Sequence, residues 1–437
     1  MAFNIGLSGL NAAAADLKVT GNNIANVGTT AFKQSRAEFG DIFTRSYGTI
    51  SKTNIGAGVR LIANTQQFTQ GTLEFTDNSL DLAITGRGFF VLNGEGNDDN
   101  TYTRAGAFQV DDEGYIVNNG APPLRLQGFP PTDPTDPKSL FRTGLRSDMQ
   151  INLGDSPPNA TADIAAQINL RSDATPPTVA TFSSDDPDSY NFSTSTTVYD
   201  SLGTPRAVTM YFIKKATPAG TWDAKVEMDG RDPPDPKEVI ETIPLTFDAN
   251  GLLTAPAPNA KTPLTIPMAK FKPVNGATVG PDDPANGATG TNIINLDLTG
   301  TTQYGQSFAV TSLEQDGYTT GRITGVDADE AGVLFIRYSN GRALPLGQVA
   351  LADFDNPQGL QQIGDNSWAE TTSSGGPVVF APGTGSLGTI QGGALETANV
   401  DLATELVNLI TAQRNYQANS QTISAANTIT QTILNIQ

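Results

Sequence analysis

The chain contains no cysteine and no histidine among its 437 residues. Without cysteine there is no disulfide framework and no thiol catalysis. Without histidine as well, most zinc sites and the commonest general base are excluded. An enzyme of this composition would have to work with carboxylate, lysine, tyrosine or serine side chains alone.

Positive charge is also scarce, since 26 Lys and Arg stand against 45 Asp and Glu and give a net charge of −19. Nucleic acids and anionic membranes are bound by basic patches, so neither is predicted as a partner. No apolar run reaches the roughly 20 residues that span a bilayer, and we expect no membrane insertion. The first basic residue is Lys18, whereas a cleaved signal peptide has a basic start, so we expect none.

Proline is absent from the first part of the chain and concentrated in the middle. None precedes Pro122, and 24 of the 28 lie between Pro122 and Pro284. Short alternating segments such as 196–199 and 207–213 recur between these prolines, which is typical of an irregular β domain. The length predicts two to four domains, and this composition marks the middle as an inserted β sandwich or barrel.

Strand patterns flank the insertion on both sides. Period-two alternation begins at Leu73 and includes 88–92 and 102–108, and it resumes after the insertion at 332–338 and 347–354. If the two ends of the chain pair, these two stretches are brought together as well.

Both ends of the chain carry a helical heptad pattern, and each pattern predicts one apolar seam. The seam residues are Phe3, Leu7, Leu10, Leu17 and Ile24 at the start, and Leu402, Leu406, Leu409, Tyr416 and Ile423 at the end. Isolated amphipathic helices are marginal in water, so these seams should pack on each other or on copies of themselves.

The two predicted helices contain little charge. Residues 3–27 include only Asp16 and Lys18, and residues 401–436 include only Asp401, Glu405 and Arg414. Coiled coils in water usually have charged flanking positions. Uncharged polar faces favour helices enclosed by other protein, although an ordinary helix pair on a globular domain is the simpler alternative.

The predicted fold class is therefore α+β and multidomain, with terminal helices forming a coiled-coil-like inner domain and two mainly β domains outside it. The expected limits are 1–35 with 398–437 for the helical polymerisation domain, 36–72 for an extended connector, 73–150 with 315–397 for a discontinuous β domain, and 151–314 for the inserted outer β domain.

Candidate chemical sites are weak. The acidic segment from Asp327 to Glu330 lacks the spaced ligands of a calcium loop and favours a tight hairpin. A carboxylate pair suited to glycoside hydrolysis depends on the fold, and no pair is singled out. We predict no catalytic residue, no cofactor and no metal.

Both termini also resemble a known family. The segments 8–15, 22–26 and 30–33 resemble the amino-terminal signature of the bacterial flagellar rod and hook axial proteins, and 393–401 and 406–419 resemble the carboxy-terminal one. The motif residues are Asn22, Asn23, Asn26, Phe32 and Asn415. Ala31 stands where the family more often has glycine. The long insertion with 199–203, 346–354 and 364–368 is similar to the hook branch of the family.

The resemblance implies a non-enzymatic structural subunit that polymerises with itself into the curved tube of the flagellar hook, a universal joint transmitting torque from rod to filament. It implies export through the flagellar type III apparatus without a cleaved signal, and an extracellular place in the flagellum. The implied partners are the distal rod protein, the hook cap protein and the hook–filament junction protein. Two alternatives stay open: a distal rod subunit, and a secreted glycan-binding or glycan-acting β protein.

Overall fold

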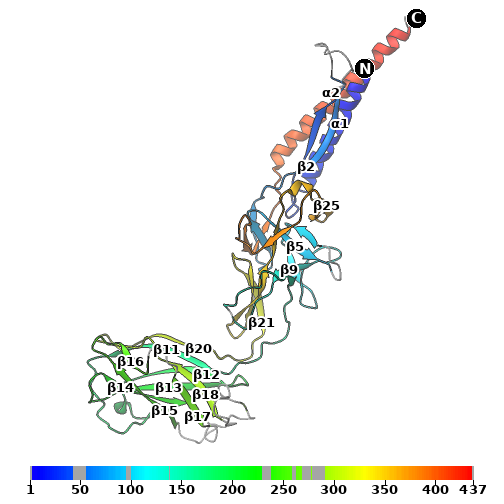
Figure 1. Ribbon diagram of the computed structural model, residues 1–437. Helices are drawn as coiled ribbons and strands as arrows, with labels where there is room; N and C mark the ends of the chain where they lie inside the picture. Colours follow the sequence, from blue (N-terminus) through cyan, green and yellow to red (C-terminus); the bar gives the residue numbers. More distant parts are fainter. Residues whose placement is uncertain are drawn as a thin grey trace. The chain divides into compact units, whose positions relative to one another are not determined.

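The computed structural model describes residues 2–42, 56–94, 100–136, 138–228, 238–257, 262–267, 277 and 291–435. These residues form two compact units (Figure 1). Unit 1 comprises Met1–Leu153, Thr324–Arg337 and Arg342–Gln437, and unit 2 comprises Gly154–Ile323 and Tyr338–Gly341. The domain limits expected from the sequence stay predictions, because the units are defined by packing and not by independent folding.

Unit 1 contains both helices, α1 (Ala2–Ala25) and α2 (Leu402–Asn435). Asp401 caps the start of α2, because its side-chain Oδ1 accepts a hydrogen bond from the Thr404 N–H at 2.7 Å. This bond lowers the pKa of Asp401 below its usual value. The helices measure about 36 and 51 Å by their rise per residue, so α2 extends past α1.

A β hairpin follows α1 and lies beside it in Figure 1. It consists of β1 (Ser35–Asp41) and β2 (Val59–Gln66), which pair antiparallel. The Val59 N–H donates to Ser8 Oγ of α1 at 3.3 Å. The predicted connector 36–72 therefore includes an ordered hairpin, and its residues 43–55 lie outside the described part of the chain.

The rest of unit 1 is a body of short strands from both sides of the insertion, called the β body below. From the first side come β3 (Leu73–Phe75), β4 (Leu82–Thr85), β5 (Phe89–Asn93), β6 (Asn100–Thr103), β7 (Phe108–Val110), β8 (Ile116–Asn118), β9 (Arg125–Phe129) and β10 (Ser147–Asp148). From the second side come β21 (Ile323–Ala328), β22 (Val333–Tyr338), β23 (Ala343–Val349), β24 (Leu351–Asp353), β25 (Gln361–Gly364), β26 (Ser367–Ala369), β27 (Val378–Phe380), β28 (Thr389–Gly392) and β29 (Ala394–Glu396).

The strand regions on the two sides of the insertion pair with each other, as expected when the two ends of the chain pair. Strand β4 pairs with β28 and β3 with β29, both antiparallel. A buried cluster that includes Phe89, Phe354 and Trp368 joins strands from both sides of the insertion. The predicted turn after Asp327 is confirmed, since the Val333 N–H donates to Asp329 Oδ1 at 2.7 Å.

Unit 2 is a sandwich of two five-stranded sheets. One sheet contains β11 (Asp163–Arg171), β17 (Thr262–Pro267), β18 (Thr291–Asp297), β19 (Thr302–Tyr304) and β20 (Ala309–Gln315). The other contains β12 (Phe192–Tyr199), β13 (Pro205–Lys214), β14 (Thr221–Met228), β15 (Glu238–Phe247) and β16 (Leu253–Ala255). Every second residue of β11 is buried, as expected for a strand with one face on a core.

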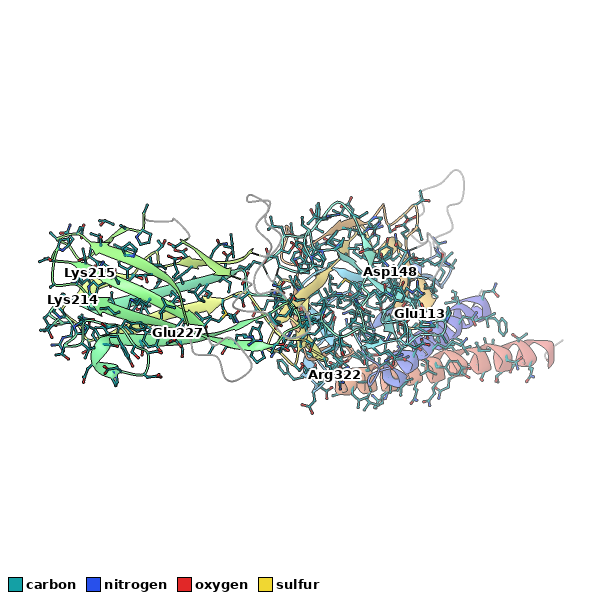
Figure 2. All side chains as sticks on the ribbon, turned by 90° about the horizontal axis from the view of Figure 1, so that it is seen from below. Glu113, Asp148, Lys214, Lys215, Glu227 and Arg322 are labelled. Carbon is teal, nitrogen blue, oxygen red and sulfur yellow. The ribbon has the colours of Figure 1, made fainter. Side chains whose placement is uncertain are left out.

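The sandwich core is apolar and includes Trp222, Phe212 and Ile294. Charged residues such as Lys214 and Lys215 lie at the end of β13 (Figure 2). Glu227 of β14 is a charged residue that is buried, and its Oε1 accepts a hydrogen bond from Ser184 Oγ at 3.1 Å. The predicted class, terminal helices with two β regions of which one is an inserted sandwich, is the observed fold.

Candidate functional site: the terminal helix pair and its junction with the β body

The two terminal helices pack antiparallel, because Gly6 of α1 lies against Ile423 while Asn23 bonds Glu405. The face of α1 that meets α2 consists of small and polar residues spaced three and four apart: Gly6, Gly9, Ala13, Asp16, Thr20 and Asn23. A Cβ added at Gly9 would clash with the Asn419 side chain. Glycine therefore permits the close approach of the two helices.

This contact face lies one position away from the predicted seam of α1. Phe3 and Leu7 are exposed, and Leu10, Leu17 and Ile24 are half-buried. On α2, Leu409 and Ile423 are half-buried, whereas Leu402, Leu406 and Tyr416 are exposed. The structure thus brings only part of the two predicted seams into the intramolecular pair, and their role between subunits stays a prediction.

Two apolar patches on the helices remain uncovered. The α2 patch consists of Leu402, Leu406, Val407 and Ile410, and the α1 patch of Phe3 and Leu7, which lie one helical turn apart. In the α2 patch, Leu406 is 45%, Val407 62% and Ile410 49% exposed. Contiguous apolar side chains on a helix of a water-exposed monomer are unusual and mark an interaction surface.

Most hydroxyl side chains of α2 are satisfied within the helix. The hydroxyls of six Ser and Thr residues donate to the carbonyl four residues earlier: Thr411, Thr422, Ser424, Thr428, Thr430 and Thr432. Because these hydroxyls already have acceptors, covering them with protein carries a small desolvation cost.

A buried ion cluster joins both ends of the chain to the β body. Glu396, Lys33 and Arg104 are all buried. The Lys33 Nζ lies 2.6 Å from Glu396 Oε1, and Arg104 Nη1 lies 3.2 Å from Glu396 Oε2. Gly71 N–H also donates to Glu396 Oε1 at 2.8 Å. One carboxylate therefore holds residues that are 363 and 292 positions away in the sequence.

Burial explains the electrostatics of this cluster. Desolvation lowers the pKa of Lys33 and of Arg104 below their usual values, and the Glu396 charge opposes that shift in both. A buried cation without its counter-ion costs several kcal/mol, so the cluster depends on the Glu396 carboxylate.

A second polar network lies where α1, β1 and α2 meet. Asn23 is buried and donates to Ser35 O at 2.8 Å and to Glu405 Oε2 at 3.2 Å, while the Ser35 N–H donates to Asn23 Oδ1 at 3.0 Å. Gln34 donates to Glu405 Oε1 at 3.0 Å and its N–H donates to Asn399 Oδ1 at 2.7 Å. Neutral amides thus satisfy the one buried carboxylate of α2.

The other motif residues have local roles. Phe32 is buried, Asn26 donates to the Asn22 carbonyl at 2.9 Å, and the Asn415 carbonyl accepts from Asn419 at 2.8 Å. Ala31 has a left-handed backbone with φ of 58° and its N–H donates to the Glu396 carbonyl at 2.7 Å. Glycine adopts this conformation without a Cβ penalty, which explains why glycine suits the position.

Five polar side chains of the junction were not predicted as site residues from the sequence: Gln34, Arg104, Glu396, Asn399 and Glu405. Glu396 and Asn399 lie within the carboxy-terminal signature and Glu405 lies between its two segments, but a polar residue in a motif does not reveal its partner. Arg104 lies in a predicted strand, and only burial shows its role.

No group of three or more Asp and Glu side chains in the part of the chain that the structure describes could hold a metal ion. Neither α1 nor α2 combines the length and the apolar character that crossing a membrane requires.

Four family models match the chain. They are a flagella basal body rod protein at 3–33, the flagellar hook protein FlgE/F/G D1 domain at 83–176, the flagellar basal body protein FlaE D2 domain at 169–318, and the flagellar basal body rod FlgEFG protein C-terminal region at 391–436. Together these matches define an axial structural protein of the bacterial flagellum.

Similar proteins identify the family within this class. The flagellar hook protein FlgE of Escherichia coli K12 is 37% identical over 451 residues, covering 100% of both chains. FlgE of Salmonella typhimurium is 35% identical over 448 residues, and FlgE of Borreliella burgdorferi is 32% identical over 456 residues. The chain belongs to the flagellar hook protein FlgE family. It is a structural subunit and not an enzyme, and proteins of this family are part of the flagellum outside the cell.

The fold has a solved counterpart. The crystal structure of Helicobacter pylori flagellar hook protein FlgE2 matches with a TM-score of 0.52 at 16% identity, covering 74% of this chain and 100% of that one. The three relatives named above match over 99–100% of this chain and are hook proteins, which favours the hook over the distal rod alternative.

Replacing Glu396 by glutamine should destabilise unit 1 by about 3–5 kcal/mol, because Lys33 and Arg104 would lose their buried counter-ion. Urea unfolding followed by tryptophan fluorescence measures this, since Trp368 lies in unit 1 and Trp222 in unit 2. With Trp222→Phe in both proteins, the Trp368 transition should move to lower urea. An unchanged midpoint would show that the cluster contributes nothing to stability.

Asp16 supplies a pH-dependent test. Partial burial, and secondly the charge of Glu405, raise the pKa of Asp16 above its usual value. The folded state therefore holds this proton to higher pH than the unfolded state, and the helix pair loses stability as pH rises through the raised pKa. Asp16→Asn should raise the melting temperature at pH 7 and weaken its fall with rising pH above the usual aspartate pKa of about 4. Circular dichroism at 222 nm measures both, and a lower melting temperature at pH 7 would contradict this account.

Proposed function

We propose that the chain builds the hook as a helical polymer of itself, in which the terminal helix pair forms the inner layer and the two apolar patches are contacts between copies. The observation that carries this proposal is the α2 patch, where Leu406, Val407 and Ile410 face solvent on a helix with almost no charge. Burying such residues between copies supplies a hydrophobic driving force for assembly.

The positions of the patches favour an open polymer. Gly6 lies against Ile423 and Asn23 bonds Glu405, so the α1 patch and the α2 patch lie at opposite ends of the helix pair. A contact between two different surfaces is heterologous, and repetition of such a contact builds a ring or an open helix. A tube is the open-helix case.

The ends of such a tube account for the further partners that we propose. At each end of the polymer one patch stays uncovered, and a protein with a similar helix pair fits it. We assign one end to the distal rod protein and the other to the hook–filament junction protein, with the hook cap protein at the growing end. Export through the flagellar type III apparatus without a cleaved signal belongs to the same proposal.

The mechanical part of the proposal separates two kinds of contact. Apolar contacts between inner helices hold the copies together, while the β body and the sandwich slide on their neighbours as the curved tube rotates. Small, weakly charged polar surfaces permit several arrangements of similar energy, which sliding requires. The tube then acts as a universal joint that transmits torque from rod to filament.

Leu406→Asp and Ile410→Asp should each abolish polymerisation while the monomer keeps its helical circular dichroism, because both side chains are exposed in one copy and buried between copies. Electron microscopy under assembly-promoting salt shows whether tubes form. A chain that lacks residues 1–30 and 400–437 is the non-assembling reference. Leu252→Asp in unit 2 changes an equally exposed leucine and should still assemble. Normal tubes from both helix variants would contradict the proposal.

A further inference from the structure

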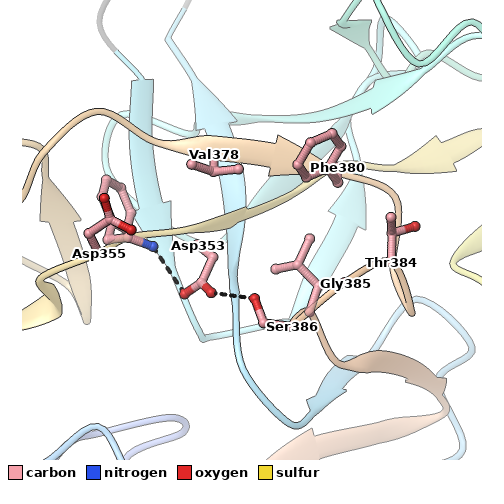
Figure 3. A pocket seen from close by; sticks show the side chains of 9 residues that line it. Asp353, Asp355, Val378, Phe380, Thr384, Gly385 and Ser386 are labelled. Atoms are coloured by element: carbon pink, nitrogen blue, oxygen red, sulfur yellow. Dashed lines mark hydrogen bonds between the residues drawn. The ribbon is translucent and has the colours of Figure 1, made fainter.

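A small acidic pocket lies on the β body, away from the helices. It has a volume of about 210 Å³ and its lining includes Asp353, Asp355, Val378 and Phe380 (Figure 3). Asp353 is held in place, because Ser386 Oγ donates to it at 2.9 Å and Arg87 Nη2 lies 3.4 Å from its Oδ1. Asp355 is exposed, and it leaves the pocket with a free negative charge at its edge.

The apolar wall of the pocket is also uncovered. Strand β27 alternates, so that Val379 packs on the buried cluster while Val378 and Phe380 point outward, and Phe380 is 49% exposed. Pockets for small-molecule ligands are usually larger, at about 300–1,000 Å³. The size and the mixture of an apolar wall with carboxylates fit one or two side chains of a protein, of which one is a cation.

A complementary segment lies elsewhere on unit 1, in the loop after β9. Phe141 packs onto the buried cluster, whereas its neighbours Leu140 and Arg142 are exposed, and Arg142 Nη2 donates to the Thr132 carbonyl of the same loop at 3.4 Å. Leu140 is 80% exposed. The loop holds these two side chains in place, because the Thr132 N–H donates to the Leu140 carbonyl at 2.7 Å and the Arg142 N–H donates to the Pro130 carbonyl at 3.0 Å.

We propose that Leu140 and Arg142 of one copy dock into the Asp353–Asp355 pocket of another copy, with Leu140 against Phe380 and the Arg142 guanidinium beside Asp355. The proposal rests on the polymerisation proposed above and adds a contact outside the helix layer. The match is of charge and of apolar surface together, and both surfaces belong to the same chain. Loop and pocket are different surfaces, so the contact is heterologous and repeats along a row of copies.

Charge reversal with mixing tests this contact. Arg142→Glu and Asp355→Lys each place like charges together, so each variant alone should need about a tenfold higher protein concentration to assemble. In an equimolar mixture the copies can alternate, so that each contact joins either the two substituted positions, which then carry opposite charges, or the two native residues. The mixture should assemble within about threefold of the wild-type critical concentration.

Critical concentrations are measured by sedimentation of polymers, with tubes checked by electron microscopy. Asp112→Lys is the matched control, because it makes the same charge change at another exposed aspartate and should assemble as wild type. The difference in critical concentration between the mixture and the single variants should become smaller at high salt, because salt screens the charges.

Two results would overturn the docking while wild-type tubes still form. Either both single variants assemble as wild type, or the mixture is no better than the single variants. If the wild-type chain forms no tubes under any salt condition, the proposed polymerisation fails, and the docking fails with it. The two failures are therefore distinguishable.

Discussion

The buried Glu396 carboxylate between Lys33 and Arg104 is the interaction on which the arrangement of unit 1 depends. Lys33 follows α1, Glu396 precedes α2, and Arg104 belongs to the β body between them. Because a buried charge is costly without its partner, this cluster is stable only when all three segments are in place. It thus fixes the junction of both helices with the β body and sets where their surfaces point.

With the junction ends of both helices fixed, the helices meet mainly through the small and polar residues of α1. Gly6, Gly9 and Ala13 allow a close approach, and Asn23 and Gln34 satisfy Glu405. The consequence is a pair that leaves several large apolar residues, among them Phe3, Leu406 and Ile410, exposed. An intramolecular contact of this kind leaves most of the hydrophobic driving force for contacts between copies, which is what a polymer subunit needs.

Sequence patterns predicted the presence of the helices, the two β regions and the inserted sandwich, because these follow from local periodicity. They did not predict which face of α1 meets α2, since the heptad of leucines and the heptad of glycine, alanine and asparagine differ by one residue. Hydrophobicity alone favours the leucines, whereas close packing favours the glycines. The partners of Glu396 lie hundreds of residues away, and no local pattern specifies such a pair.

The central claim is that the α2 patch is exposed in one copy and buried between copies. Because the natural chain has no cysteine, a single Val407→Cys substitution provides a unique thiol at a residue that is 62% exposed. The rate of maleimide labelling, compared between monomer and assembled tube, measures this burial directly. The account predicts rapid labelling of the monomer and strong protection in the tube. Equal labelling rates in the two states would contradict it.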